Sequence, residues 1–259
     1  MQYRPTVSIC TVTHNRQHFL PRLEQCIRTQ TYPSELIQWV LLDDSSNNID
    51  FTPSLAGLGL GVKYQRLSEK LPIGRKRNLS HQLCLGDIIV YMDDDDFYPP
   101  ARIEHAVNSL VSSDCLIAGS TYMPILFVHE CDFWMAGPYA PRHATANTFA
   151  LKRDLLSTTS YRDDDVCGEE KHFLKGFTIP MVQLHPLSTI ICIAHASNTF
   201  NKDLLRQQAK DAGGSVKTFR PFQYVSDVQR STIANIARTY AALDQAVWLS
   251  LVLPIYRSI

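Results

Sequence analysis

Apolar, strand-like runs that end abruptly in polar residues recur three times in the first hundred residues. The run TVSICTV (6–12) leads into Thr13, His14 and Asn15, IQWVLLDD ends in Asp43 and Asp44, and DIIVYM leads into Asp93, Asp94, Asp95 and Asp96. Segments with helical spacing of apolar residues, such as HFLPRLEQCIRTQ, lie between them. Strands that alternate with helices predict an α/β fold with a doubly wound, mostly parallel sheet flanked by helices.

The polar residues that follow these runs are expected to share one edge of the sheet. In doubly wound sheets, ligands bind outside the carboxyl ends of the strands. Four consecutive carboxylates repel one another and raise one another's pKa, so the DDDD run is either a solvated loop or a cation site. Its position at a strand end favours the cation site, and carboxylates prefer Mg²⁺ or Mn²⁺.

The second half of the chain is less regular, and we expect it to complete the sheet. Strand-like runs such as PILFVH and STIICIAH mix there with short helical ones. We expect a single domain over residues 1–259, with a first half over 1–100, a smaller, mixed subregion over 101–225, and a C-terminal helix over 226–259.

Charge and cysteine usage exclude several classes of protein. Lys+Arg and Asp+Glu are equal at 25 each, so the chain lacks the basic footprint of nucleic-acid binders. Seven scattered cysteines without a CxxC pair indicate buried thiols in a reducing compartment. MQYRPTVSIC has no signal-peptide core and no apolar run approaches a membrane span, so we expect a cytoplasmic protein. The apolar AVWLSLVLPIY closes the core or, as a minority alternative, contacts a membrane surface.

Six segments resemble, in the same order, the motifs of inverting nucleotide-sugar glycosyltransferases of the GT-A fold, the family 2 type. They are VSICTVTHNR, VLLDDSS, GRKRN, YMDDDDFYPP, GEEKHF and IAHASNTF. Each motif alone is short and degenerate, but six of them in the correct order make the resemblance specific. The resemblance runs from residue 7 to about 200 and implies a GT-A (Rossmann-like) sheet, with YMDDDDFYPP similar to the metal-binding DXD motif.

The resemblance implies a donor site that binds a nucleotide-sugar together with Mn²⁺ or Mg²⁺. Asp95 matches the metal-ligating residue, with Asp93 and His195 as further ligands, although a lone His near an apolar strand is more often structural. Asp44 matches the residue that binds the nucleobase, its alternative being a turn cap. The remaining donor-side candidates are Thr11, Thr13, His14 (where the family usually has Tyr), Asn15, Arg77 for the diphosphate, and Asp93, Asp94 or Asp96 for the ribose.

The resemblance also implies a catalytic carboxylate. Glu170 occupies the position of the family's catalytic Asp and Glu169 that of its neighbour, and we favour Glu170 as the base. Both could instead be helix N-terminal carboxylates that the helix dipole favours. The implied reaction is an in-line displacement by an acceptor hydroxyl, for example of a glycan. UDP is the favoured nucleotide, with GDP and dTDP open. Trp134, Tyr139, His143 and Asn147 lie where acceptor residues often occur, but core packing explains the aromatics better.

Three other functions compete with this hypothesis. A nucleotidyltransferase would open with a glycine-rich phosphate loop, and TVTHNRQHF has no glycine. A non-catalytic nucleotide- or sugar-binding module stays open because Glu replaces Asp and His replaces Tyr. A calcium loop at DDDDFYPP lacks the alternating ligands and glycine of an EF-hand. Retention of configuration is also open, since the fold alone does not fix stereochemistry.

Overall fold

A computed structural model describes residues 4–47, 57–196, 198, 201–211, 219–222 and 230–242. The chain divides into two compact units. Unit 1 comprises Met1–Thr121 and Tyr139–Ile190, and unit 2 comprises Tyr122–Pro138 and Ile191–Ile259. The expectation of one domain over residues 1–259 stays a prediction, and none of the three unit boundaries falls at the predicted division near residue 100.

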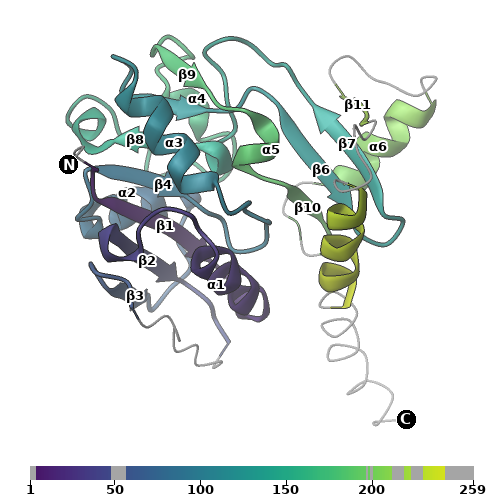
Figure 1. The fold of residues 1–259 in the computed structure, drawn as a ribbon, viewed down its shortest axis with the longest axis horizontal. Helices are drawn as coiled ribbons and strands as arrows, with labels where there is room; N and C mark the ends of the chain where they lie inside the picture. The colour runs from purple at the N-terminus through teal and green to yellow at the C-terminus, as the bar shows by residue number, and fades with distance from the viewer. Residues whose placement is uncertain are drawn as a thin grey trace. The chain divides into compact units, whose positions relative to one another are not determined.

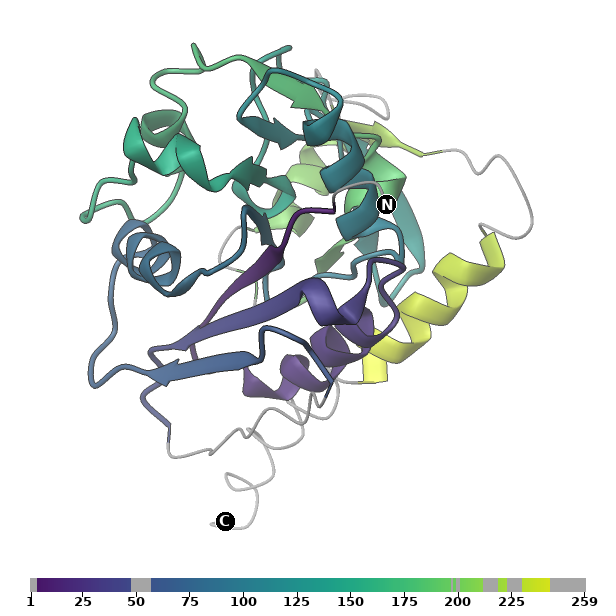
Figure 2. The same ribbon diagram turned by 60° about the vertical axis from the view of Figure 1, so that its left-hand side comes forward.

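Unit 1 is built around a seven-stranded sheet in the order β3-β2-β1-β4-β8-β5-β9 (Figure 1). The strands are β1 (Val7–Thr13), β2 (Ile37–Asp43), β3 (Val62–Arg66), β4 (Ile88–Tyr91), β5 (Ile117–Gly119), β8 (Ala150–Lys152) and β9 (Met181–Gln183). β1 pairs in parallel with β2 and β4, β2 with β3, and β5 with β9, whereas β8 is antiparallel to β4 and β5. The purple-to-blue strands β1, β2 and β3 run alongside one another in Figure 2. The predicted mostly parallel α/β sheet is confirmed.

Hydrophobic residues cover both faces of this sheet. Every residue of β1, β2 and β4 is buried, as expected of parallel strands with both faces packed. One core cluster joins Ile9 and Val90 of the sheet to α1 (Leu20–Arg28) and α3 (Arg102–Val111). The next residue along each strand belongs to the second cluster, on the opposite face, as the two-residue period of a strand requires.

The second face is covered by one longer helix and two short ones. They are α2 (Ile73–Leu83), η4 (Arg153–Ser157) and α4 (Glu170–Phe173), and the unit also contains η1 (Gln17–Phe19), η2 (Ser34–Leu36), η3 (Ala146–Thr148) and α5 (Pro186–Thr189). Phe173 of α4 packs in the second cluster and stacks on Tyr161 with ring centroids 4.3 Å apart. This packing anchors the one-turn helix α4, which is too short to be stable by itself.

Unit 2 contains a second, smaller sheet in the order β10-β6-β7-β11. Its elements are β6 (Met123–Phe127), β7 (Asp132–Ala136), β10 (Cys192–Ala194), α6 (Lys202–Asp211) and β11 (Phe219–Pro221). Trp134 is 2% exposed and stacks on Phe219 at 4.8 Å, so it is a core residue of this unit. Residues 230–242 are helical, within the predicted C-terminal helix.

The apolar segment AVWLSLVLPIY, for which we weighed a membrane-surface contact, lies outside the described residues. Within the described part of the chain, none of the helices has the length and apolar character needed to cross a membrane.

His81 makes the stability of the fold depend on pH. The side chain is buried on α2, with Nε2 2.5 Å from the Tyr91 hydroxyl. Burial, together with the nearby Arg77 charge, lowers the pKa of His81 to about 3. In the unfolded chain the imidazole titrates near 6.5, so between pH 6.5 and 3 only the unfolded state binds this proton. The free energy of unfolding should therefore decrease as the pH falls, by about 2 kcal/mol at pH 5.

Denaturant unfolding at pH 7 and pH 5 measures this effect. His81→Gln, which cannot titrate, should lose less stability than the native chain between the two values. The comparison isolates His81 from buried carboxylates, whose raised pKa values act in the opposite direction. Equal losses in the two proteins would contradict the prediction.

Candidate active site

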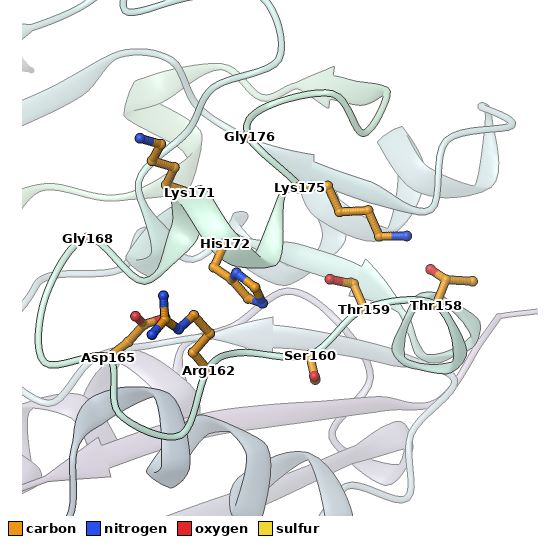
Figure 3. A pocket seen from close by; sticks show the side chains of 10 residues that line it. All are labelled: Thr158, Thr159, Ser160, Arg162, Asp165, Gly168, Lys171, His172, Lys175 and Gly176. Atoms are coloured by element: carbon orange, nitrogen blue, oxygen red, sulfur yellow. The ribbon is translucent and has the colours of Figure 1, made fainter.

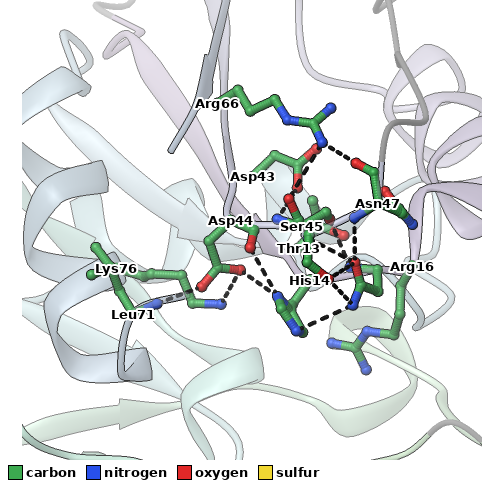
Figure 4. Close-up of polar contacts among 12 residues, drawn as sticks. Thr13, His14, Arg16, Asp43, Asp44, Ser45, Asn47, Arg66, Leu71 and Lys76 are labelled. Carbon is green, nitrogen blue, oxygen red and sulfur yellow. Dashed lines mark hydrogen bonds and ion pairs between the residues drawn. The ribbon is translucent and has the colours of Figure 1, made fainter. Parts of the chain in front are cut away.

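The three predicted strand ends meet at one edge of the sheet in unit 1. The Thr13 hydroxyl, at the end of β1, donates to Oδ2 of Asp94 at 2.6 Å. His14 Nδ1 lies 3.1 Å from Oδ1 of Asp44, just after β2 (Figure 4). The expected convergence of residues after β1, β2 and β4 is thus confirmed, because parallel strands bring their carboxyl ends to the same edge.

The acidic run that follows β4 is a buried cluster, not a solvated loop. Asp94, Asp95 and Asp96 are 1%, 7% and 3% exposed. Burial raises the pKa of Asp93, against the opposing effect of Arg77. Burial likewise raises the pKa of Asp94 to about 8, although Arg16 favours its ionised form. These carboxylates therefore need positive charge nearby in order to ionise.

Arg16 supplies part of that charge, and the sequence analysis missed it. Its guanidinium spans two members of the run, with Nη1 2.5 Å from Oδ2 of Asp95 and Nη2 3.0 Å from Oδ1 of Asp94. Burial alone would lower the pKa of Arg16, but the carboxylates raise it above its usual value. Its position three residues after the end of β1 was the available signal, because a residue there must lie near the strand-end carboxylates.

The carboxylates fit a divalent cation that completes its coordination with phosphate and water. Oδ1 of Asp93 and Oδ1 of Asp94 are buried and form no hydrogen bond in the described part of the chain, although guanidinium nitrogens of Arg77 and Arg16 lie 3.6 and 3.0 Å from them. Among the same residues, no three His, Cys, Asp or Glu side chains already converge as a metal cage. Mg²⁺ is typically held by one or two carboxylates plus substrate phosphates, so a closed cage is not required. Oxygen ligands of this kind suit Mg²⁺ and Mn²⁺.

His195, the third predicted metal ligand, belongs to unit 2. It follows β10 and is 7% exposed, and its Nε2 lies 2.9 Å from Nδ2 of Asn198. Its role as a ligand stays a prediction.

Asp44 and Asp43 have different surroundings. Asp43 accepts the Ser45 amide at 2.8 Å and the Tyr64 hydroxyl at 2.9 Å, so it is the residue that caps the turn after β2. Burial would raise the pKa of Asp43, but these hydrogen bonds outweigh it and lower the pKa. Oδ1 of Asp44 instead lies 3.0 Å from Nζ of Lys76, a contact that the sequence did not suggest. Lys76 belongs to the basic segment GRKRN, whose charged side chains would ordinarily be solvated, yet it is 6% exposed.

Thr11 and Asn15, two other predicted donor-side residues, hold the strands and the loop of the site in place through hydrogen bonds. Thr11 is fully buried, and its hydroxyl donates to the Met92 carbonyl at 2.7 Å and accepts from Trp39 at 3.0 Å. It therefore ties β1 to both neighbouring strands and is not accessible to a ligand. Asn15 has a left-handed backbone (φ 55°), and its Oδ1 accepts the Ser46 amide at 3.0 Å, which fixes the loop after β2.

Arg77 connects the acidic run to the Glu169–Glu170 pair. Its Nε lies 3.0 Å from Oε1 of Glu169 and its Nη2 lies 3.6 Å from Oδ1 of Asp93. The guanidinium also lies over the Tyr91 ring, 4.7 Å from the centroid. In the described part of the chain its buried Nη1 has no hydrogen-bond partner, so the group retains a donor for an anionic ligand.

The structure distinguishes the two glutamates. Glu169 is 7% exposed and its carboxylate is held by Arg77. Glu170 is the first residue of α4 and, among the residues described, forms no ion pair. Burial raises the pKa of Glu170 above its ordinary value, with the charge of Glu169 adding to the effect. A carboxylate with a raised pKa and no bound cation is better suited to accept a proton.

A polar pocket of about 700 Å³ lies beside α4 in unit 1, and neither glutamate is among the residues that line it (Figure 3). Gly168 and Lys171, which flank the glutamates in sequence, both line it, together with Arg162, Asp165 and His172. Charged groups and hydroxyls dominate the lining, so the pocket can bind polar ligands.

The predicted acceptor residues of unit 1 have different surroundings. Asn147 reaches the acidic run, and its Nδ2 donates to Oδ2 of Asp96 at 3.0 Å. The His143 ring contacts the rings of Tyr139 and Phe177 in tilted arrangements, with centroids 4.7 and 4.4 Å away. Burial lowers the pKa of His143.

Comparison with known proteins agrees with this arrangement. Residues 8–129 match the model of glycosyl transferase family 2. A search of curated proteins found no matching relative. The family match covers β1 through the acidic run and ends before Glu169 and Glu170, so it includes the strand-end site but not the glutamate pair.

Similar solved structures show that the chain has the GT-A fold. The mannosyltransferase PcManGT from Pyrobaculum calidifontis, in complex with GDP-Man and Mn²⁺, is 17% identical, with a TM-score of 0.59 over 99% of this chain and 83% of that chain. S. aureus TarS 1–349 is 12% identical, with a TM-score of 0.55 over 88% of this chain and 69% of that one. The same TarS fragment with UDP-GlcNAc has a TM-score of 0.53 at 13% identity, over 95% and 75% of the two chains.

Proposed function

We propose that this glycosyltransferase moves a sugar from a nucleoside-diphosphate sugar to an acceptor hydroxyl, with inversion at the anomeric carbon. The observation that carries the proposal is the Arg77 bridge, which places buried strand-end carboxylates on one side of a guanidinium and the Glu169–Glu170 pair on the other. UDP is the favoured nucleotide. GDP is the second candidate, because PcManGT was solved with GDP-Man and TarS with UDP and UDP-GlcNAc.

The donor side uses Asp95 and Asp93 as metal ligands, with His195 as a further one. A bound Mn²⁺ or Mg²⁺ neutralises the negative charge of the diphosphate leaving group. Arg77 binds a diphosphate oxygen through its unpaired Nη1. Asp94, fixed by Thr13, contacts the ribose, and the His14 ring stacks on the base.

The acceptor side uses Glu170 as the general base. Its carboxylate takes the proton of the acceptor hydroxyl, whose oxygen forms the new bond to the anomeric carbon. The bond between that carbon and the diphosphate oxygen breaks on the opposite face, and its electron pair leaves with the diphosphate. Glu169 holds Arg77 in place and does not take part in the proton transfer.

The acceptor is a glycan or another molecule that presents a hydroxyl group. The pocket beside α4 supports this class of acceptor, because its lining offers hydroxyls, cations and a carboxylate for hydrogen bonding. Asn147, through its contact with the acidic run, orients the acceptor side of the donor sugar. Trp134 is better explained by packing, because it is buried and stacks on Phe219, whereas Tyr139 is exposed.

Turnover of a panel of UDP- and GDP-sugars tests the proposal. The protein is incubated with each donor, Mn²⁺ and a mixture of mono- and oligosaccharide acceptors, and released UDP or GDP is measured. We expect release from one donor class, and an inverted anomeric configuration by NMR. Binding of a nucleotide without release from any donor would contradict the proposal and favour the non-catalytic binding module.

Removal of Arg16 should strengthen metal binding. Its guanidinium occupies Oδ2 of Asp95, the oxygen that a cation would need. Arg16→Met should bind Mn²⁺ about tenfold more tightly in the absence of nucleotide, because the strong charge-assisted contact no longer competes. Calorimetric titration with Mn²⁺ measures the change, and Arg22→Met, which removes an exposed arginine of α1, is the control. Unchanged or weaker Mn²⁺ binding in Arg16→Met would contradict this expectation.

A further inference from the structure

Lys76 is a buried cation in the strand-end site whose purpose the proposed chemistry leaves unexplained. It lies on α2, 6% exposed, with Nζ 3.0 Å from Oδ1 of Asp44. Burial lowers the pKa of Lys76, while Asp44 and Asp94 oppose the shift and favour the ammonium. A lysine is rarely buried unless it is paired or functional. The effect of Asp94 also indicates that the ammonium lies close to the acidic run.

Asp44 is poorly placed to contact a nucleobase by itself. Its side chain is completely buried, and its Oδ2 already accepts the Leu71 amide at 2.8 Å. Its Oδ1 is shared between Lys76 and His14. Figure 4 shows these two side chains approaching the carboxylate from different sides. The side chains of Lys76 and His14 retain 8% and 25% exposure, whereas that of Asp44 retains none, so Lys76 and His14 are the members of this group that a ligand can reach.

We propose that Lys76 is a specificity-determining residue that donates a hydrogen bond to the keto oxygen of the donor's nucleobase, with Asp44 holding its ammonium in place. The proposal rests on the proposed function and names the class of base that the same site selects. An ammonium is a donor only. Uracil O4 and guanine O6 accept hydrogen bonds, whereas the amino groups at the same positions of cytosine and adenine are donors.

The selection follows from the cost of unpaired donors. Against cytosine or adenine, the Lys76 ammonium and the base amino group would face each other as two donors, and both would lose their hydrogen bonds to water. A site built to hydrogen-bond one group discriminates strongly against an analogue that lacks it. A purely structural Lys76–Asp44 ion pair, which only fastens α2 to β2, would not distinguish one base from another.

Two pairs of nucleotides distinguish a base-selecting Lys76 from a purely structural Lys76–Asp44 ion pair. UDP and CDP differ only at positions 3 and 4 of the pyrimidine, and GDP and ADP form the corresponding purine pair. Calorimetry with Mn²⁺ should show that the native protein binds UDP over CDP, or GDP over ADP, by at least about tenfold. Lys76→Met should bring that ratio close to one. Arg75→Met, which removes the adjacent, exposed cation of the same helix, should leave it unchanged.

Lys76→Met leaves the buried Asp44 carboxylate without its cation, which can impair folding. A second variant is therefore the control for this effect. The double variant Asp44→Asn/Lys76→Met removes both charges and should show the same loss of discrimination. A native protein that binds CDP as well as UDP, and ADP as well as GDP, would overturn the role of Lys76 while nucleotide binding stands. A preference that survives in both variants, or an equal loss of affinity for all four nucleotides, would also overturn it. Failure of the native protein to bind any of the four would overturn the proposed function as well.

Discussion

Replacement of Glu170 by glutamine should reduce kcat by about 10²- to 10⁴-fold, the usual contribution of a general base. Glutamine keeps the shape of the side chain but cannot accept the proton of the acceptor hydroxyl. Because Glu170 forms no ion pair among the described residues, the change leaves no buried cation behind, and the donor site should be preserved. Initial rates with saturating donor, together with calorimetric binding of the nucleoside diphosphate, measure the two effects separately.

Glu169→Gln is the matched comparison, since the two residues are adjacent in sequence. It removes the carboxylate that Arg77 contacts at 3.0 Å, so we expect weaker nucleotide binding and lower stability. A variant Glu170→Gln that retains more than a tenth of the native kcat would show that another group acts as the base. Loss of nucleotide binding in Glu170→Gln would place that residue on the donor side instead.

Arg77→Met should destabilise the fold by about 3–5 kcal/mol, the cost of removing one partner from a buried ion pair. Arg77 is 3% exposed and stands between the carboxylates of Asp93 and Glu169, which would then remain buried without their cation. The lost contact with the Tyr91 ring adds to the effect. Denaturant unfolding measures the change, and nucleotide binding should weaken in parallel because the diphosphate loses a donor.

The variant Arg77→Lys tests whether the charge or the planar shape of the arginine side chain stabilises the fold. Arg77→Lys keeps the positive charge but cannot span both carboxylates with a planar fork, so it should restore only part of the stability. Arg75→Met, on the exposed face of the same helix, should change stability by less than about 0.5 kcal/mol. A stability of Arg77→Met within that range of the native value would contradict the bridging role.

The sequence predicted the strands of residues 1–100 well because their hydrophobic pattern has only one physical interpretation. β1, β2 and β4 are buried along their whole length, so they appear as continuous apolar runs whose ends are marked by polar residues. Parallel pairing then determines that these ends meet, and the contacts of Thr13 with Asp94 and of His14 with Asp44 follow. The strands of the second half, such as β5, β8 and β9, have only three residues each, too few to show a period.

The partners of the acidic run could not be predicted from composition or spacing. Arg16 and Lys76 are charged residues in polar segments, and such residues are usually solvated. Only the approach of α2 and of the turn after β1 to the same edge of the sheet brings them into ion pairs with carboxylates there, Arg16 with Asp95 and Lys76 with Asp44. Thr11 shows the opposite case, because its hydroxyl is used entirely between strands.

The choice between Glu169 and Glu170 likewise required the structure. In GEEKHF the two carboxylates are equivalent by pattern, and the resemblance alone favoured Glu170. They differ because the main chain enters α4 between them, which turns Glu169 toward Arg77 and leaves Glu170 at the start of the helix.

Calorimetric binding of UDP and GDP, with and without Mn²⁺, to the native chain and to Asp95→Ala tests most directly whether the buried acidic run holds a metal–diphosphate complex. Asp164→Ala, which removes an exposed carboxylate, is the control. We predict binding of one nucleotide that requires Mn²⁺, persists in Asp164→Ala, and is weakened at least a hundredfold in Asp95→Ala, a loss of about 2.7 kcal/mol. Tight binding that ignores both the metal and the Asp95 substitution would contradict the account.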